Sequence, residues 1–114
     1  MLMKRSGVAP TVSADAWVAS SAVVAGNVTI GAGCVIDNGA LQVSSGPQIR
    51  IAAGVTVMPG AVIRSTGDAD RPAFQVEIGM DCLIGPQASL AGCQLGEAVY
   101  VATQGMIFSD RPDR

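Results

Sequence analysis

The 114-residue sequence contains no histidine, and aromatic residues make up only 4% of it. Histidine is the commonest general base in enzymes and a frequent zinc ligand, so the chain lacks a side chain on which many active sites depend. Aromatic side chains are scarce. The interior must therefore be filled by small residues and branched aliphatic residues. We therefore expect a narrow hydrophobic core in a single domain.

Charged residues are also scarce, at 14% of the chain, and the net charge is -2. This charge gives no electrostatic footprint for nucleic acid, and the high hydrophobic content excludes disorder. The sequence has no run of 18 apolar residues, so no membrane span is predicted. No apolar segment follows MLMKR, so no signal peptide is predicted. Three cysteines without CxxC spacing indicate reduced thiols. These features predict a cytoplasmic protein with no nucleic-acid or membrane partner.

A repeat of six residues runs through the chain. A period of six fits neither the alternation of a strand nor the 3.6-residue turn of a helix, and it is typical of solenoid proteins. One nine-residue step, one longer insertion and one five-residue step interrupt the repeat. The repeating positions are Val12, Val18, Val24, Ile30, Ile36, Gln42, Ile51, Val57, Ile63, Ile78, Ile84, Leu90, Leu95, Val101 and Ile107.

Each repeat predicts one short strand followed by a tight corner. Alternation along a strand directs the repeating residue and the residue two before it into the core. Residues that tolerate a left-handed backbone follow three positions later, namely Asp15, Asn27, Gly33, Gly39, Gly54, Gly60 and Asp81. Three repeats make one triangular coil, and coils stack about 4.8 Å apart. The repeat itself does not determine the hand of the coil, for which the usual crossover rule gives right-handed.

The sequence therefore predicts an all-β fold, a single-stranded parallel β-helix of about five triangular coils. Residues 1–11 are expected to be an irregular lead-in, and residues 12–108 the β-helix. The β-helix carries a loop insertion at 64–77. Residues 109–114 form a polar tail, and no large C-terminal helix is expected. A β-helix exposes a strand edge at its end, so the last coil is a candidate docking site for a partner protein or a second trimer.

The residues just before the repeating positions point outward and sort onto three faces. The first face is polar, with Thr11, Thr29, Arg50, Glu77 and Gln94, whereas the other two are mainly apolar. Contiguous exposed apolar surface marks an interface, and two adjoining apolar faces suit a closed homotrimer. Scattered apolar surface residues are the alternative interpretation. The predicted trimer interface comprises Trp17, Val23, Val35, Leu41, Val62, Leu83, Tyr100 and Met106.

Three long segments, GNVTIGAGCVI, IDNGALQVSSGPQIRIAAGVTVMPGAVIR and IGMDCLIGPQASLAGCQLGEAVYVATQGM, carry a family resemblance. Over Val12 to Met106 the chain resembles the γ-class carbonic anhydrases and their relatives in the hexapeptide-repeat superfamily. The resemblance implies a left-handed β-helix and a homotrimer. It also implies a zinc site between subunits, built from three histidines.

At the positions that match those histidines, this chain has Arg64, Pro86 and Ala91. None of these offers an imidazole, thiolate or carboxylate, so the resemblance implies no metal and no cofactor here. Four further positions are polar in the family and support its zinc site. In this chain they are Val43, Ser45, Met58 and Pro59. Without a metal, no group here would bring the pKa of a water near neutrality, and carbonic anhydrase activity is not expected.

The leading hypothesis is a non-catalytic trimeric scaffold or binding module. The alternative is a small-anion or acyl-ligand binding protein, or a divergent acyltransferase, that uses the inter-subunit cleft around Arg64. Arginine binds carboxylate or phosphate bidentately, although Arg64 is equally able to pair across the interface with an acid such as Asp81 or one in residues 68–70. An acyltransferase would need an unusual base, for which Asp68, Asp70 and Glu77 are the candidates. For the first two acids a solvated loop is the favoured interpretation, because loops tolerate insertions and charges.

The three cysteines fall at different places in the repeat. Cys34 and Cys82 occupy inward positions, where cysteine behaves as a small hydrophobic residue. Cys93 lies in the corner that the five-residue step tightens, and it is the cysteine expected to be within reach of a reagent. A metal or redox triad is the alternative interpretation, although the three residues come from different coils.

Overall fold

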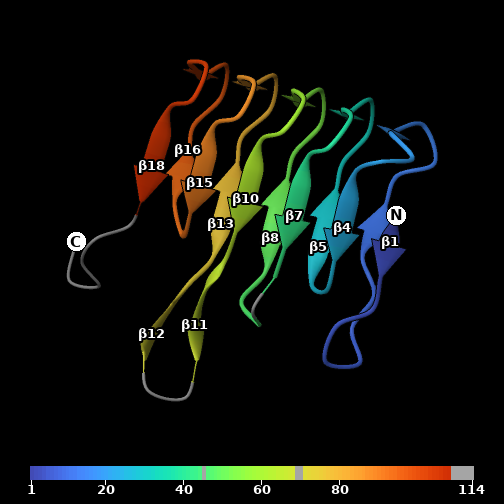
Figure 1. Ribbon diagram of the computed structural model, residues 1–114, viewed down its shortest axis with the longest axis vertical. Helices are drawn as coiled ribbons and strands as arrows, with labels where there is room; N and C mark the ends of the chain where they lie inside the picture. The colour runs from blue at the N-terminus through green and yellow to red at the C-terminus, as the bar shows by residue number, and fades with distance from the viewer. Residues whose placement is uncertain (45, 69–70, 109–114) are drawn as a thin grey trace.

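The computed structural model describes residues 1–44, 46–68 and 71–108, with only the backbone described for 66–68 and 71–73. Three parallel sheets wrap around one narrow core (Figure 1). Each pass of the chain adds one strand to each sheet in turn. The sheets form the three sides of a prism, which we call face 1, face 2 and face 3.

The strands of each face stack in chain order. Face 1 comprises β2 (Thr11–Val12), β5 (Val28–Ile30), β8 (Ile49–Ile51), β13 (Val76–Ile78) and β16 (Gln94–Leu95). Face 2 comprises β3 (Trp17–Val18), β6 (Val35–Ile36), β9 (Thr56–Val57), β14 (Leu83–Ile84) and β17 (Tyr100–Val101). Face 3 comprises β1 (Leu2–Met3), β4 (Val23–Ala25), β7 (Leu41–Val43), β10 (Val62–Arg64), β15 (Ser89–Ala91) and β18 (Met106–Phe108).

The observed strand register confirms the predicted parallel β-helix of about five coils. On face 2, for example, Val35 pairs with Trp17 on one side and with Thr56 on the other. The outward residues of each predicted face stack on one another in the same way. The part of the chain that the structure describes contains no helix, and so no helix long and apolar enough to cross a membrane.

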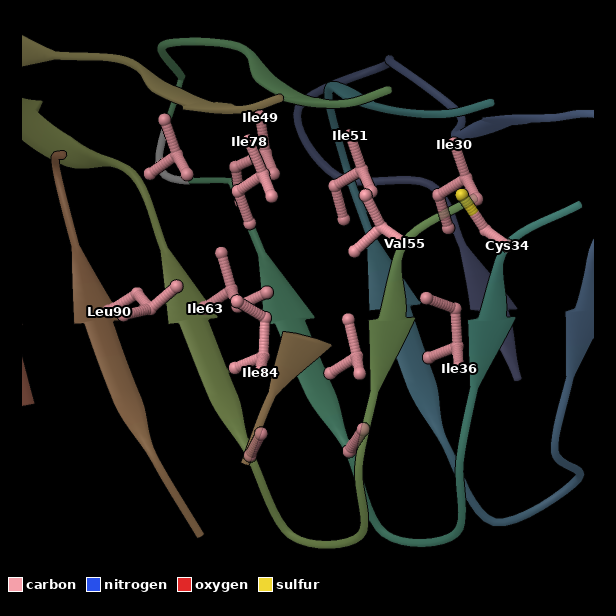
Figure 2. Packing of buried hydrophobic residues seen from close by; sticks show 14 of the residues in the cluster. Ile30, Cys34, Ile36, Ile49, Ile51, Val55, Ile63, Ile78, Ile84 and Leu90 are labelled. Atoms are coloured by element: carbon pink, nitrogen blue, oxygen red, sulfur yellow. The ribbon is translucent and has the colours of Figure 1, made fainter. Parts of the chain in front are cut away.

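The core consists of the inward side chains predicted from the repeat. Ile36, Ile63, Ile84 and Leu90 are fully buried and converge on the prism axis (Figure 2). Gln42 occupies the same inward position on β7 and is also fully buried, but neither its amide oxygen nor its amide nitrogen has a hydrogen-bond partner. The described core is thus mainly aliphatic, with the thiols of Cys34, Cys82 and Cys93 and the buried amide of Gln42 among the aliphatic side chains.

Most corners adopt the predicted left-handed backbone. Gly33, Gly39, Gly54, Gly60 and Asp81 have φ between 60° and 74°. The prediction was wrong at Asp15 and Asn27, and in the second case the preceding Gly26 takes the positive φ instead. Three further corners place residues other than glycine in this region, namely Gln87, Ala98 and Gln104. Stacking on the neighbouring coil therefore fixes these corners even where the local sequence does not favour them.

The lead-in is not wholly irregular, as the sequence had suggested. Leu2 and Met3 form β1, which pairs in parallel with Val24 and Ala25 of β4. The segment then turns back through Ser6 and Gly7, both with positive φ, and Arg5 and Val8 exchange two backbone hydrogen bonds. An uncovered first coil would expose the unpaired backbone groups of β4, and β1 satisfies them.

The insertion is a β-hairpin and not the expected loop. Arg64 belongs to β10, and Val76 and Glu77 belong to β13, so the insertion is shorter than the predicted 64–77 range. Between them, β11 (Thr66–Asp68) and β12 (Arg71–Phe74) pair antiparallel and project from the prism (Figure 1). Because the insertion leaves and re-enters the prism at the same corner, its two arms start close together and pair.

Candidate functional site

Face 3 presents a wide apolar outer surface. Most of its strands are three residues long, so each has an outward residue on either side of its inward one. The first outward column contains Val23, Leu41, Val62, Ser89 and Met106. The second contains Met3, Ala25, Val43, Arg64, Ala91 and Phe108, of which Ala25 and Ala91 are buried. Sequence reasoning missed the second column because it assigned one outward residue to each strand.

Face 2 presents a narrower apolar strip. Its strands are two residues long, and Trp17, Val35, Leu83 and Tyr100 follow one another along it, with Thr56 at the centre. Trp17 and Tyr100 are 53% and 60% exposed. The eight predicted interface residues therefore all lie at the surface of the single chain, and none is part of its core.

Arg64 is the charged residue in the outer columns of face 3. Its backbone is held on β10 between Val43 and Ala91, and its carbonyl accepts a hydrogen bond from the Gly92 amide at 3.0 Å. Its side chain is exposed and forms no ion pair within the described part of the chain. A guanidinium on a rigid strand, surrounded by apolar residues, is thus available to a partner.

The four described candidate ligand-site residues do not meet within one chain. Arg64 and Ala91 are register partners at the carboxyl end of the face 3 strands. Met58 and Pro86 lie at the opposite end, in the corner between faces 2 and 3, where the Met58 amide donates to the Ile84 carbonyl. Ser45 lies outside the described residues. A site that combines both groups requires a second copy of the chain.

Of the three candidate general bases, the structure describes the side chain of Glu77. Glu77 is exposed in the middle of face 1, where it is the register partner of Arg50. Only the backbone of Asp68 is described, and Asp70 lies outside the described residues.

Several of the described charged residues lie on the edges of the prism. Asp15, Asp81 and Glu97 lie on the edge where the chain passes from face 1 to face 2. The Asp15 carboxylate accepts a hydrogen bond from the Ser13 hydroxyl at 2.7 Å and one from the Gly33 amide at 3.2 Å, and both lower its pKa. Lys4, Arg5 and Arg64 instead lie on the edge between faces 3 and 1, which we call the 3–1 edge.

All three cysteines are buried. Cys34 and Cys82 point inward as predicted, and their thiols donate to the carbonyls of Ala52 and Gly96, both at 3.0 Å. The expected accessibility of Cys93 was wrong, because its side chain is only 8% exposed and burial raises the pKa of its thiol. Within the described residues, no three histidine, cysteine or acidic side chains gather in a metal-binding cluster.

No protein-family model matches the sequence, and no curated protein is similar to it. Among solved structures, the chain resembles the CcmM N-terminal domain, which was crystallised in complex with CcmN. The TM-score is 0.77, the sequence identity is 18%, and the alignment covers 94% of each chain. At this identity, the similarity shows that the two chains share a fold.

Proposed function

We propose that this protein is a non-catalytic, γ-carbonic-anhydrase-like scaffold that forms a homotrimer and binds other proteins. The observation that carries the proposal is the apolar outer surface of face 3, which extends over six strands. A large apolar surface exposed to water marks an interaction site, so we expect another molecule to cover it. The apolar strip on face 2 supplies a second contact surface, as a closed ring of identical subunits requires.

The residues at the expected zinc positions support a role without catalysis. Arg64, Pro86 and Ala91 carry no group that binds zinc, and the chain has no histidine to replace them. The solved structure of similar fold contains a partner protein, which supports a role in protein binding for this fold. The prism would therefore serve assembly with other proteins and not the hydration of CO₂.

Metal analysis combined with a CO₂ hydration assay tests the absence of catalysis. The purified full-length chain is dialysed against zinc, its metal content is measured, and hydration is followed by stopped flow. We expect less than one zinc per three chains and no hydration above the buffer rate, because no three ligands are available. Stoichiometric zinc together with measurable hydration would contradict the proposal.

A further inference from the structure

Asn38 and Gly39 form the only Asn-Gly pair in the sequence. They lie in the corner where the chain passes from β6 on face 2 to β7 on face 3, and both are exposed. Asparagine is a thermolabile residue, because the next backbone nitrogen can attack its side-chain carbonyl carbon. Glycine has no side chain, so its nitrogen is little hindered in such an attack. The corner is therefore a candidate site of chemical modification.

The Ser21 hydroxyl bridges the two groups that would react. It lies in the equivalent corner of the preceding coil, between β3 and β4. The hydroxyl donates a hydrogen bond to the Asn38 side-chain oxygen at 3.0 Å and accepts one from the Gly39 amide at 3.1 Å. Both are normal hydrogen-bond lengths. One hydroxyl thus contacts both the attacking nitrogen and the carbonyl that it would attack.

This bridge can carry the proton that the reaction has to move. When the Gly39 nitrogen bonds to the Asn38 side-chain carbon, the nitrogen loses a proton and the carbonyl oxygen gains one. The Ser21 hydroxyl can accept the first proton and give its own to the oxygen. Its hydrogen bond to that oxygen also stabilises the negative charge that develops there. Proton transfer through a positioned side chain accelerates reactions of this kind.

The backbone of the corner is held in place by its neighbours. The Asn38 amide donates to the Asp37 carboxylate at 2.7 Å, and the Asn38 backbone carbonyl accepts a hydrogen bond from the Gly60 amide of the next coil at 3.1 Å. These contacts keep Asn38 and Gly39 beside the Ser21 hydroxyl. Reacting groups that are held together by the fold lose less entropy on reaching the transition state.

We propose that Asn38 is a site of spontaneous deamidation, promoted by the Ser21 hydroxyl. The Gly39 nitrogen forms a bond to the Asn38 side-chain carbon, the bond from that carbon to its amide nitrogen breaks, and ammonia leaves with the proton that the Gly39 nitrogen has lost. Water then opens the resulting succinimide ring to aspartate or isoaspartate. The reaction takes place within one chain and needs no bound partner, so this inference goes beyond the proposed scaffold function and does not rest on it.

Both products would change the edge between the two apolar faces. Each places a carboxylate where the chain now has a neutral amide. Isoaspartate also lengthens the main chain, at a corner whose carbonyl is hydrogen-bonded to the Gly60 amide. The modification therefore converts a well-ordered corner into a charged and distorted one.

Peptide mapping by mass spectrometry tests the proposal on the folded, full-length chain. The protein is kept at mildly alkaline pH, and conversion of Asn38 and of Asn27 to aspartate and isoaspartate is followed over time. Asn27 should convert more slowly, because it precedes the branched residue Val28, whose amide donates to the Gly26 carbonyl at 2.8 Å. Ser21→Ala should slow the conversion of Asn38 about tenfold, because the bridging hydroxyl is lost.

Ser21→Thr is the matched control, since it keeps a hydroxyl and should keep the rate. In urea the corner is unfolded, and the Ser21→Ala variant should then convert as fast as the original chain. The proposal is overturned if folded Asn38 converts no faster than Asn27, if Ser21→Ala leaves its rate unchanged, or if Ser21→Thr slows it as much as Ser21→Ala does. A difference that persists in urea would also overturn it. None of these results affects the scaffold function, which zinc content and CO₂ hydration test separately.

Discussion

Replacing Gly85 by alanine is expected to lower the free energy of unfolding by about 3 kcal/mol. Gly85 lies directly over the backbone of the last coil, and an added Cβ would be 2.5 Å from the Val101 carbonyl oxygen and 2.8 Å from the Ala102 carbonyl carbon. Backbone atoms cannot rotate away as a flexible side chain does. The substitution therefore forces the last two coils apart, which urea denaturation at fixed protein concentration would measure.

Gly96→Ala is the matched control for this prediction. An added Cβ at Gly96 meets no atom within 4 Å, so its effect should stay within about 0.5 kcal/mol. Equal stability of the two variants would contradict the close stacking of coils at Gly85. A loss of stability confined to Gly85→Ala would show that contact between neighbouring coils, and not glycine flexibility, requires glycine at this corner.

Replacing Gln42 by methionine is expected to raise the free energy of unfolding by about 1–3 kcal/mol. The Gln42 amide is fully buried between coils, and neither of its polar atoms has a hydrogen-bond partner. Methionine has a similar length and shape, so it removes the cost of the unsatisfied amide without opening a cavity. Thermal and urea unfolding of the two proteins would measure the difference.

Gln48→Met provides a control of opposite sign. The Gln48 side-chain amide donates to the Thr29 hydroxyl at 3.1 Å, so its loss should destabilise the protein by about 0.5–1.5 kcal/mol. If Gln42→Met instead destabilises the fold by more than 1 kcal/mol, the buried amide has a partner in solution, and the interior of the second coil is more polar than described.

The period of six made most of the fold predictable from the sequence. Alternation along each strand assigns every residue to the core or to the surface, so the repeat alone predicted the inward positions and the three faces. Even Gln42, an amide among aliphatic residues, was placed inward by the repeat, and it is fully buried. Glycine and aspartate identified many of the corners, because few other residues tolerate the left-handed backbone of a corner.

The remaining features depend on contacts between coils that no local pattern records. Ala98 adopts φ of 56° although alanine does not favour it, because stacking of the corner on its neighbour decides the conformation. β1 forms because β4 has a free edge, and the β11–β12 hairpin forms because its two arms leave one corner. Cys93 is buried because the corner that was expected to expose it is packed against the core cluster.

The candidate site was only partly predictable. The repeat placed Arg64 and Ala91 in adjacent coils, and the observed register agrees. It gave no indication that the three-residue strands of face 3 carry a second outward column, which joins Arg64 to Val43 and Phe108 on one surface. The position of Lys4 and Arg5 on the same edge as Arg64 was also missed, because both belong to the lead-in and not to the repeat.

The mass of the protein in solution tests the trimeric scaffold most directly. Sedimentation velocity at micromolar concentration should give about 35 kDa, three times the 11.5 kDa of one chain. Val62→Glu, which places a charge in the centre of face 3, should give the monomer, because the interface would bury an unpaired carboxylate. Thr11→Glu adds the same charge on the exposed face 1 and should remain a trimer. If the unsubstituted protein is a monomer at this concentration, the trimeric scaffold is contradicted.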